Sequence, residues 1–467
     1  MLTTRLRSAV RAASGTLSHI RAATLCPCED AIPSTSDSAP VGSAEGFRLY
    51  SGTAPLFMRA GGRLDVSAVA AAIEDADGLA SIRSEDLVVN RTTTPKPKPA
   101  LSELLFGRIM TDHMLQAAWN VNTGWSAPSI DPLAPLQLHP AAQVLHYGIE
   151  CFEGMKAYMG VDGRIRMFRP DKNMDRLARS AQRLNLPDFE KVEYLECIKE
   201  LLRVERDWLP DKEGFSLYLR PTYIATTPTL GIAPPSAALL YTIISPVGPY
   251  FPTGVKPIKL FVDTRHARAW PGGVGDCKVG GNYASTIRPQ VQAAALGCQQ
   301  VLYVLDNGAE GDGIVGESGA MNVFFLWRRK DGKKELVTPP LDGMILPGVT
   351  RDTVLSLVRS WSEFEVAERP IRWREIEAAV AENRMLEMFG TGTAVIIQPI
   401  STLLKSDGTA LTVPFDSAET SRWIDRKPGT TYGAQKEPTT SLAGRLMRTI
   451  MDVQYGHTDS PWSVPVS

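Results

Sequence analysis

Strand-like and helical patterns are interspersed along this chain without regular strand–helix alternation, and this order most limits the fold it can adopt. Apolar strand-like runs occupy Leu217–Tyr223, Ala238–Ile244, Gln300–Leu305, Asn322–Trp327 and Glu335–Thr338. Amphipathic helical patterns cover Asp171–Leu184, Thr350–Trp361 and about Leu442–Val453. In the first of these helices Met174, Leu177 and Ala181 share one face. The order predicts an α+β protein rather than a doubly wound α/β protein.

The 467 residues are enough for two ordinary domains and additional segments. We expect a presequence in 1–28, a variable lead-in in 29–100, a small α/β domain in 101–245, a linker in 246–252 and a large second domain in 253–467. Ser245–Phe251 (SPVGPYF) is predicted to break regular structure and connect the domains. Within the lead-in, Thr92–Pro99 is predicted as an extended connector and Val66–Ile82 as a short Ala-rich helix.

The first 25 residues are basic and amphipathic. Arginines stand at 5, 7, 11 and 21, no acid precedes Glu29, and apolar residues recur at helical spacing from Leu6 to Ile20. This composition is typical of a mitochondrial presequence, whereas a secretory signal requires a continuous apolar stretch. We therefore expect the mitochondrial matrix, with an irregular N-terminus on a cytoplasmic protein as the alternative.

Composition excludes several classes of function. Hydrophobic residues make up 43% and charged residues 22%, and the net charge is −1, so nothing indicates nucleic acid or an anionic membrane as a partner. No apolar run approaches the roughly 20 residues needed to cross a bilayer. The six cysteines are too scattered for a disulfide framework, and one close pair, Cys26 and Cys28, makes a poor metal site. We expect reduced thiols and no metal.

The most unusual stretch is Gly272–Tyr283 (GGVGDCKVGGNY), in which five glycines surround Lys278. A lysine with a depressed pKa in a confined site is a nucleophile toward an aldehyde cofactor, and Tyr283 could hydrogen-bond a phenolate. The alternative is a flexible surface loop with a solvated lysine. The glycines form neither a dinucleotide-binding pattern nor a phosphate-binding P-loop.

Three further places could contact a cofactor. Glu317 begins an apolar strand and is either exposed or buried beside a cation such as a protonated pyridine nitrogen. Pro347–Thr350 opens a helix, and Phe389–Ala394 (FGTGTA) offers backbone N–H groups and hydroxyls, so either could hold phosphate. Arg176 could add a charge, although an arginine on an amphipathic helix is usually solvated.

From about Leu104 to the C-terminus the chain resembles the branched-chain aminotransferases among the fold-type IV pyridoxal-phosphate enzymes. The matching motifs are FGRIMTDHM (106–114), LHYGIECFEG (145–154), NMDRLARSA (173–181), SLYLRPT (216–222), SPVGPYF (245–251), RAWPGGVGDCKVGGNY (268–283), GCQQVLY (297–303), TPPLDGMILPGVTRD (338–352), EMFGTGTA (387–394) and QYG (454–456). So many motifs in the same order indicate membership of this family.

The resemblance implies a two-domain fold-type IV fold with pyridoxal 5′-phosphate in the large domain. Lys278 would carry the cofactor as a Schiff base and move the substrate Cα proton, Tyr283 would bind the cofactor O3′, and Glu317 its pyridine nitrogen. The residues implied to hold or neighbour the phosphate are Arg176, Val349, Thr350, Thr393 and Arg268. Those implied to bind substrate are Phe106, Tyr147, Phe152 and Tyr218 around the side chain, Arg220 at the distal carboxylate of glutamate, and Ala394 at the α-carboxylate.

The resemblance also implies a reaction, in which the amino group of L-leucine, L-isoleucine or L-valine passes to 2-oxoglutarate and gives L-glutamate. The partners are then small-molecule substrates and a second copy of the chain, in a homodimer whose partner partly closes the site. An aromatic pocket supplies transfer energy for an aliphatic side chain, and one arginine at its rim can bind a carboxylate.

Two positions depart from the family pattern. Many relatives have threonine where this chain has Ala320, which puts one substrate-carboxylate contact in doubt. Mammalian forms carry a redox CxxC where this chain has Val395–Gln398, which excludes thiol switching at that place.

Two other interpretations compete with a branched-chain aminotransferase. The first is another fold-type IV enzyme, a D-amino-acid transaminase or aminodeoxychorismate lyase, but those enzymes lack the long DHM and SPVGPYF blocks. The second is a cofactor-free binding protein, against which the intact set of Lys278, Tyr283, Glu317 and Arg176 argues.

Overall fold

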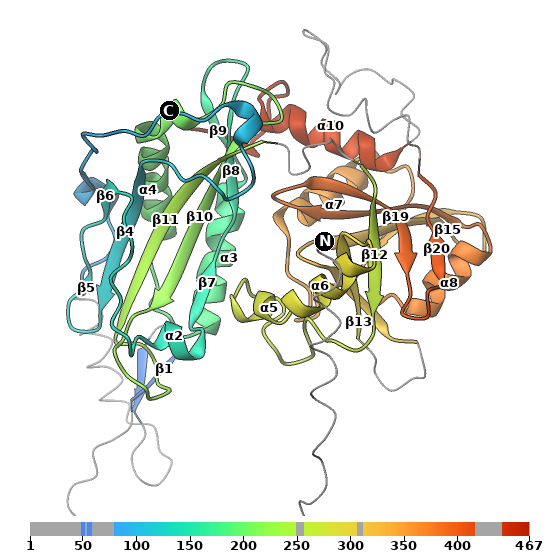
Figure 1. The fold of residues 1–467 in the computed structure, drawn as a ribbon, viewed down its shortest axis with the longest axis horizontal. Helices are drawn as coiled ribbons and strands as arrows, with labels where there is room; N and C mark the ends of the chain where they lie inside the picture. Colours follow the sequence, from blue (N-terminus) through green and yellow to red (C-terminus); the bar gives the residue numbers. More distant parts are fainter. Residues whose placement is uncertain are drawn as a thin grey trace, which may run out of the picture. The chain divides into compact units, whose positions relative to one another are not determined.

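The computed structural model describes residues 48–51, 54–57, 79–248, 256–305, 312–415 and 441–466. Strands β1 (Arg48–Ser51) and β2 (Ala54–Phe57) pair with each other in an antiparallel sheet. The other strands form two larger sheets, which Figure 1 shows with the first in blue to green and the second mainly in yellow to orange. The mixture of strands and helices confirms the α+β prediction.

The first sheet has ten strands in the order β21-β9-β8-β10-β11-β4-β6-β3, with β5 paired to β4 and β7 to β10. All pairs are antiparallel except β3 with β6. The strands are β3 (Val88–Val89), β4 (His113–Asn120), β5 (Gly124–Trp125), β6 (Ser129–Pro132), β7 (Glu150–Phe152), β8 (Met155–Met159), β9 (Ile165–Phe168), β10 (Ser216–Ala225), β11 (Ala237–Val247) and β21 (Ser463–Val466).

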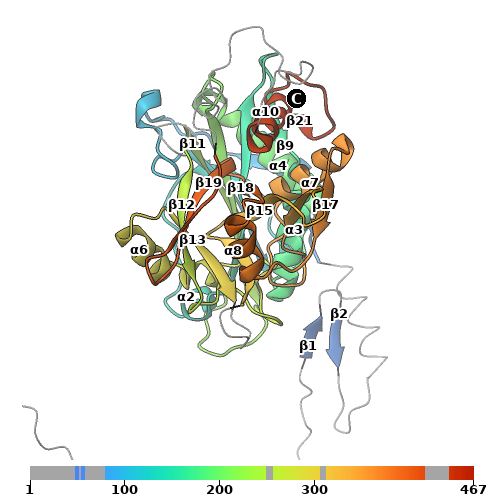
Figure 2. The same cartoon turned by 90° about the vertical axis from the view of Figure 1, so that its right-hand side faces the viewer.

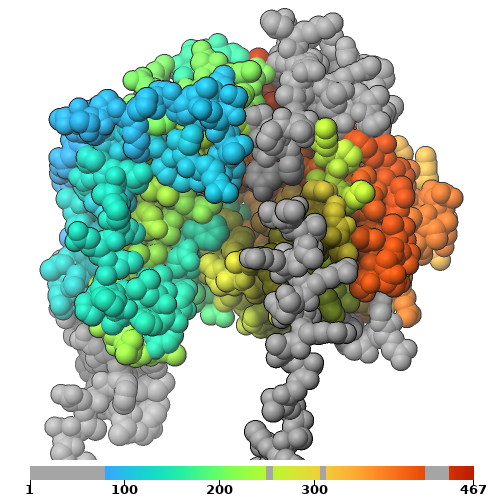
Figure 3. Space-filling model, viewed as in Figure 1, coloured from blue at the N-terminus to red at the C-terminus, as the bar shows by residue number. Residues whose placement is uncertain are grey.

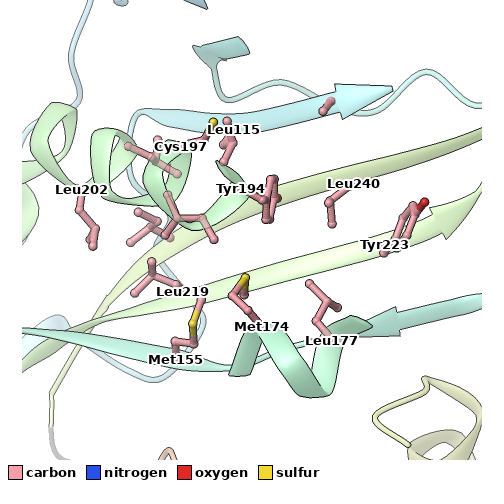
Figure 4. Packing of buried hydrophobic residues seen from close by; sticks show 14 of the residues in the cluster. Leu115, Met155, Met174, Leu177, Tyr194, Cys197, Leu202, Leu219, Tyr223 and Leu240 are labelled. Atoms are coloured by element: carbon pink, nitrogen blue, oxygen red, sulfur yellow. The ribbon is translucent and has the colours of Figure 1, made fainter. Parts of the chain in front are cut away.

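Helices α3 (Pro170–Arg183) and α4 (Lys191–Val204) pack against the first sheet. Figure 4 shows Met174 and Leu177 of α3 and Tyr194 of α4 directed at strand residues in one apolar cluster. The predicted apolar face of α3 is therefore confirmed, since Met174, Leu177 and Ala181 are all buried. The remaining elements of this part are α2 (Gln143–Tyr147), η1 (Ser84–Asp86), η2 (Leu101–Glu103) and η3 (Arg206–Trp208).

The second sheet has nine strands in the order β14-β13-β12-β19-β18-β15-β16-β17, with β20 paired to β19. It is mixed, because β12 pairs in parallel with β13 and β19, and β16 with β17. The strands are β12 (Ile258–Asp263), β13 (Gln300–Leu305), β14 (Ile314–Ser318), β15 (Asn322–Arg328), β16 (Lys334–Thr338), β17 (Glu365–Glu368), β18 (Met385–Gly392), β19 (Ile396–Leu404) and β20 (Ala410–Thr412).

The helices after the first sheet are α5 (Gly281–Ala284), α6 (Ile287–Ala295), α7 (Val349–Trp361), α8 (Trp373–Ala381) and α10 (Leu442–Gln454). Helix α8 packs on β18, and α10 contacts both β19 of the second sheet and β9 of the first (Figure 2). In the space-filling view of Figure 3, residues of the first sheet lie on the left and residues of the second on the right.

All five predicted strands and all three predicted helices are present, within a few residues of their predicted ends. One prediction is wrong: Ser245–Val247 does not break regular structure but continues β11, with Ser216 opposite Val247. Pairing of β11 with β4 has already ended at Thr242, so Pro246 lies where the strand has one neighbour and a missing N–H is tolerated. Residues 249–252 of the predicted linker lie outside the described residues.

The predicted domain boundaries differ from the structure in two places. The end of the predicted lead-in joins the first part of the molecule, because Ile82 is fully buried in its core and β3 pairs with β6. The C-terminal strand β21 also returns to the first sheet, where it pairs with β9. The predicted presequence and nearly all of the predicted helix Val66–Ile82 lie outside the described residues. Thr92–Pro99 contains neither helix nor strand, as its prolines predict.

Candidate active site

A cavity of about 400 Å³ is lined by residues from both large sheets and the loops between them. Backbone pairing joins the two parts at this place, since the Phe152 N–H donates to the Lys278 carbonyl at 3.0 Å. Of the residues predicted for the site, the cavity wall contains Phe106, Phe152, Arg176, Tyr218, Arg220, Lys278, Tyr283, Glu317, Val349, Thr350, Thr393 and Ala394. Residues that are far apart in the sequence therefore meet around one cavity of ligand size.

Lys278 lies on the loop before α5, with its amine directed at the cavity. Its Nζ donates to the Tyr283 hydroxyl at 2.9 Å and lies 4.7 Å from the Phe152 ring centre. Its backbone N–H donates to the buried hydroxyl of Ser180 on α3 at 2.9 Å. The amine is held between two aromatic rings rather than solvated, so the alternative of a flexible surface loop does not fit.

One glycine of this loop allows close packing behind the lysine. A Cβ on Gly275 would overlap the Met344 carbonyl oxygen and lie 2.5 Å from the Ala269 Cβ. A Cβ on Gly281, by contrast, would meet nothing within 4 Å. The glycines around Lys278 are therefore not equivalent, and Gly275 is one that the fold requires.

Glu317 is buried at the end of β14, with 3% of its surface exposed. Asn322 Nδ2 donates to its Oε1 at 2.7 Å, and an Arg268 guanidinium nitrogen lies 2.5 Å from its Oε2. Burial raises the pKa of the Glu317 carboxyl above its usual value, and the charge of Arg268 opposes this shift. The sequence left exposure and burial open for Glu317, and the structure resolves this in favour of burial beside a cation.

Arg176 is buried on α3 and faces a fully buried carboxylate. Its Nε and one terminal nitrogen donate to Glu153 at 2.7 and 2.8 Å, and the other donates to the Pro347 carbonyl at 3.1 Å. Burial alone would raise the pKa of Glu153, but Arg176 and Asn173 outweigh it and hold that pKa below its usual value. These contacts use three of the five guanidinium N–H groups, which leaves two for a ligand.

Two backbone segments offer donors for an anion. Helix α7 begins at Val349, and its first N–H groups have no intrahelical partner. On the turn between β18 and β19, the N–H groups of Thr393, Ala394 and Val395 donate to no other group in the described part of the chain. The buried hydroxyl of Thr391 also faces the cavity without a hydrogen-bond partner.

The opposite part of the cavity wall is aromatic. Phe106 packs edge-on against Tyr218 with ring centres 4.7 Å apart. The Arg220 guanidinium lies 4.7 Å from the Phe152 ring centre and donates to the Tyr218 hydroxyl at 3.1 Å. The buried Nε of Arg220 has no hydrogen-bond partner. A carboxylate entering this aromatic region would therefore meet a desolvated, under-used cation.

Two predicted residues lie elsewhere in the single chain. Tyr147 on α2 is 39% exposed, and its hydroxyl donates to the Leu230 carbonyl. Arg268 does not line the cavity but stands behind Glu317. Sequence reasoning passed over Asn322, Met321 and Thr391, which do line it. Strand alternation could have indicated Thr391, because Thr391 and Thr393 are two residues apart at the end of one strand.

These groups fit a phosphorylated pyridine aldehyde. The amine of Lys278 would meet the aldehyde, the carboxylate of Glu317 a protonated ring nitrogen, and Arg176 with the α7 N-terminus a phosphate dianion. The described residues contain no cluster of ligands for a metal ion. Among the described helices none combines the length and apolarity needed to cross a membrane. The fold and site thus define an enzyme built around an organic cofactor of the pyridoxal phosphate type.

Comparison with known proteins identifies the family. A model described as amino-transferase class IV matches residues 150–403. The cytosolic branched-chain-amino-acid aminotransferase of Ovis aries is 45% identical over 388 residues, which is 83% of this chain and 94% of that protein. The mitochondrial enzyme of Rattus norvegicus is 49% identical over 336 residues, covering 72% of this chain and 84% of its own.

The fold has solved relatives as well. The branched-chain aminotransferase of Thermoproteus uzoniensis superposes with a TM-score of 0.56 at 24% identity, over 75% of this chain and 99% of that one. A thermophilic relative determined with pyridoxamine 5′-phosphate gives a TM-score of 0.56 at 23% identity, over 77% and 100%. At these identities the superpositions establish the fold alone.

The chain belongs to the class IV aminotransferases, in the branch that contains the branched-chain-amino-acid aminotransferases. It is therefore an aminotransferase with the fold-type IV fold, and its cofactor is pyridoxal 5′-phosphate.

Proposed function

We propose that this protein transfers the amino group of L-leucine, L-isoleucine or L-valine to 2-oxoglutarate, with Lys278 as the residue that binds pyridoxal 5′-phosphate. The observation that carries the proposal is Arg220 inside an aromatic pocket, 4.7 Å from the Phe152 ring centre. A branched-chain substrate needs the apolar surface, and the distal carboxylate of 2-oxoglutarate needs the cation. The names of the curated relatives support the same substrates.

When bound, the cofactor supplies an aldehyde that exchanges amino groups and a ring that stores the electron pair left as the substrate Cα loses its proton. Lys278 Nζ is the group proposed to take and return that proton. The Tyr283 hydroxyl, 2.9 Å from Nζ, holds the amine in position. Glu317 provides the buried negative charge opposite the ring nitrogen, while Arg176 and the first N–H groups of α7 hold the phosphate.

The activity is tested by measuring initial rates of glutamate formation from 2-oxoglutarate with each of the three L-amino acids, using the D-isomers as controls. We expect turnover with the L-isomers alone. Turnover with D-isomers would indicate a D-amino-acid transaminase, and no turnover with any L-donor would refute the substrate assignment.

The role of Lys278 is tested without turnover. Borohydride reduction of the holoenzyme followed by peptide mass analysis should locate the cofactor on Lys278, and Lys278→Ala should lose the absorbance band of the bound cofactor. An adduct on another lysine, or a colourless wild-type protein in excess cofactor, would exclude this role and would favour a cofactor-free binding protein.

We propose further that two copies form a homodimer through an apolar patch made of Leu145, Tyr147, Leu230 and Ile232. These residues are 57%, 39%, 66% and 81% exposed. Gln143 ties the two segments together by donating to the Ala233 carbonyl at 2.9 Å. An exposed apolar cluster of this kind is typical of a subunit interface. In light scattering, Ile232→Asp should convert a dimer to monomers, whereas a wild-type monomer would refute the dimer.

For localisation we propose the mitochondrial matrix, because the segment 1–28 is rich in arginine and contains no acid before Glu29. Relatives occur in both cytosolic and mitochondrial forms. Fusion of residues 1–28 to a fluorescent reporter should direct it to mitochondria, and replacement of the four arginines by glutamine should leave it in the cytosol. A cytosolic reporter with the native segment would favour the cytoplasmic alternative.

A further inference from the structure

A buried lysine that the proposed mechanism does not use contacts the wall of the same cavity. Lys156 lies on β8 and is 9% exposed. Its Nζ donates to the Ala394 carbonyl at 2.9 Å, across the boundary between the two large sheets. Within the described part of the chain, no carboxylate lies within 4 Å of this amine. A buried ammonium without a carboxylate is costly, so its place next to a ligand cavity requires an explanation.

The sheet register directs Lys156 to the face that carries the pocket. Lys156 lies directly opposite Tyr218 on β10, and side chains of directly paired residues in an antiparallel sheet share one face. Tyr218 and Arg220, two residues apart on that strand, both line the cavity. Lys156 therefore extends from the substrate-pocket face of the first sheet toward the turn of the second sheet.

The turn that it reaches needs to be held in place. Thr393, Ala394 and Val395 connect β18 to β19, and the next residue, Ile396, has φ of +62°. Positive φ is unfavourable for a β-branched side chain, so contacts from outside must maintain this conformation. In a planar trans peptide the carbonyl and the following N–H point in opposite directions. A donor that fixes the Ala394 carbonyl therefore also fixes the direction of the Val395 N–H.

We propose that Lys156 is a positioning residue that holds the Ala394–Val395 peptide so that the N–H groups of this turn receive the substrate α-carboxylate. The N–H groups of Thr393, Ala394 and Val395 have no other partner in the described residues, and all three residues line the cavity. A charged donor on the carbonyl also polarises the peptide and strengthens its N–H as a donor. Burial lowers the pKa of Lys156 to about 8, so at neutral pH the amine retains its charge. This inference rests on the proposed transaminase function.

The test compares Lys156→Met, which removes the charge and the donor, with Lys156→Arg, which keeps both. Amino donor and 2-oxo acid acceptor share the α-carboxylate, so we expect KM for both to rise about tenfold in Lys156→Met, with kcat lowered by less than about threefold. The Kd of the holoenzyme for 4-methylvalerate, a carboxylate without an amino group, should rise by a similar factor. Lys156→Arg should restore part of the affinity. Lys172→Met, at an exposed position on α3, is the control and should match wild type.

Three results would overturn the inference. The first is KM and Kd values within about twofold of wild type in Lys156→Met. The second is a weaker affinity for pyridoxal 5′-phosphate with unchanged KM, which would assign the turn to the cofactor phosphate. The third is a lower Tm with unchanged KM, which would make Lys156 a structural tether only.

Two further arrangements keep the outcome interpretable. If Lys156→Met does not fold, Lys156→Gln keeps an N–H donor without the charge, and an unchanged KM in that variant overturns the inference equally. Failure of the proposed function is recognised separately, because it would appear as absent turnover in the wild-type enzyme, whereas the 4-methylvalerate measurement requires no turnover.

Discussion

Replacing Glu153 by glutamine should destabilise the apoenzyme far more than the holoenzyme. Glu153 is fully buried and accepts two hydrogen bonds from Arg176, at 2.7 and 2.8 Å, and one from Asn173 at 2.8 Å. Glutamine has nearly the same shape but carries no charge and replaces one acceptor oxygen with a donor. The variant therefore leaves the Arg176 guanidinium buried and uncompensated.

The size of the effect follows from the burial of both partners. Breaking a buried ion pair by removing one charge typically costs about 3–5 kcal/mol. We expect a loss in this range for the apoenzyme, because Arg176 is only 6% exposed. If the cofactor phosphate lies on the two remaining N–H groups of Arg176, it supplies a replacement negative charge. The holoenzyme should then lose roughly half as much.

Urea unfolding at pH 7 of apo and holo forms measures both losses. Inorganic phosphate should also raise the Tm of apo Glu153→Gln more than that of the apo wild type. Glu200→Gln is the matched control, because Glu200 forms a partly exposed pair with Arg203 on α4 and should cost less than about 1 kcal/mol. Equal losses in apo and holo Glu153→Gln would show that Arg176 does not meet the phosphate, and an apo loss below about 1 kcal/mol would refute the energetic argument itself.

Three further predictions concern other parts of the site. Gly275→Ala should yield protein with reduced cofactor content, because its Cβ would overlap the Met344 carbonyl oxygen, while Gly281→Ala should retain wild-type content; equal absorbance spectra would contradict this. Arg220→Met should raise KM for 2-oxoglutarate about tenfold and leave KM for leucine within about twofold, and equal changes in both would remove the assigned selectivity. Lys156→Met should be more stable than wild type at pH 7, by up to about 3 kcal/mol, because burial lowers the pKa of Lys156 to about 8. Between pH 8 and about 10.4 the unfolded chain holds a proton that native Lys156 has lost, so wild-type stability should rise and the difference should close; a constant difference in urea unfolding would contradict this.

The sequence predicts those features that depend on local pattern. Helix α3 was predictable from the spacing of Met174, Leu177 and Ala181, and strand β13 was predicted with the bounds observed. The burial of Arg176 was not predictable in this way, because it depends on Glu153, which lies 23 positions away on a different element. Pro246 indicates a break by local rules, and only the end of the β4 pairing explains why the strand continues.

Site residues divide along the same line. Motif resemblance placed Lys278, Tyr283 and Glu317 in one site, and these residues line one cavity. Nothing in the local sequence around Lys156 indicates that its amine reaches Ala394, 238 residues away. Such contacts depend on how the two sheets face each other, which single-chain pattern carries only weakly.

The buried charges around the cavity explain why stability and function should separate here. Glu153 with Arg176, Glu317 with Arg268, and Lys156 without a carboxylate all lie in or directly behind its wall. A core of apolar residues would be at least as stable, since buried pairs seldom repay their desolvation. An anionic, nitrogen-containing ligand accounts for all three placements. It also predicts opposite signs on mutation: removing one member of a pair, as in Glu153→Gln, should destabilise the apoenzyme, whereas removing the lone cation, as in Lys156→Met, should stabilise it while weakening substrate binding. Two substitutions of the same sign would mean that these charges serve the fold rather than the ligand.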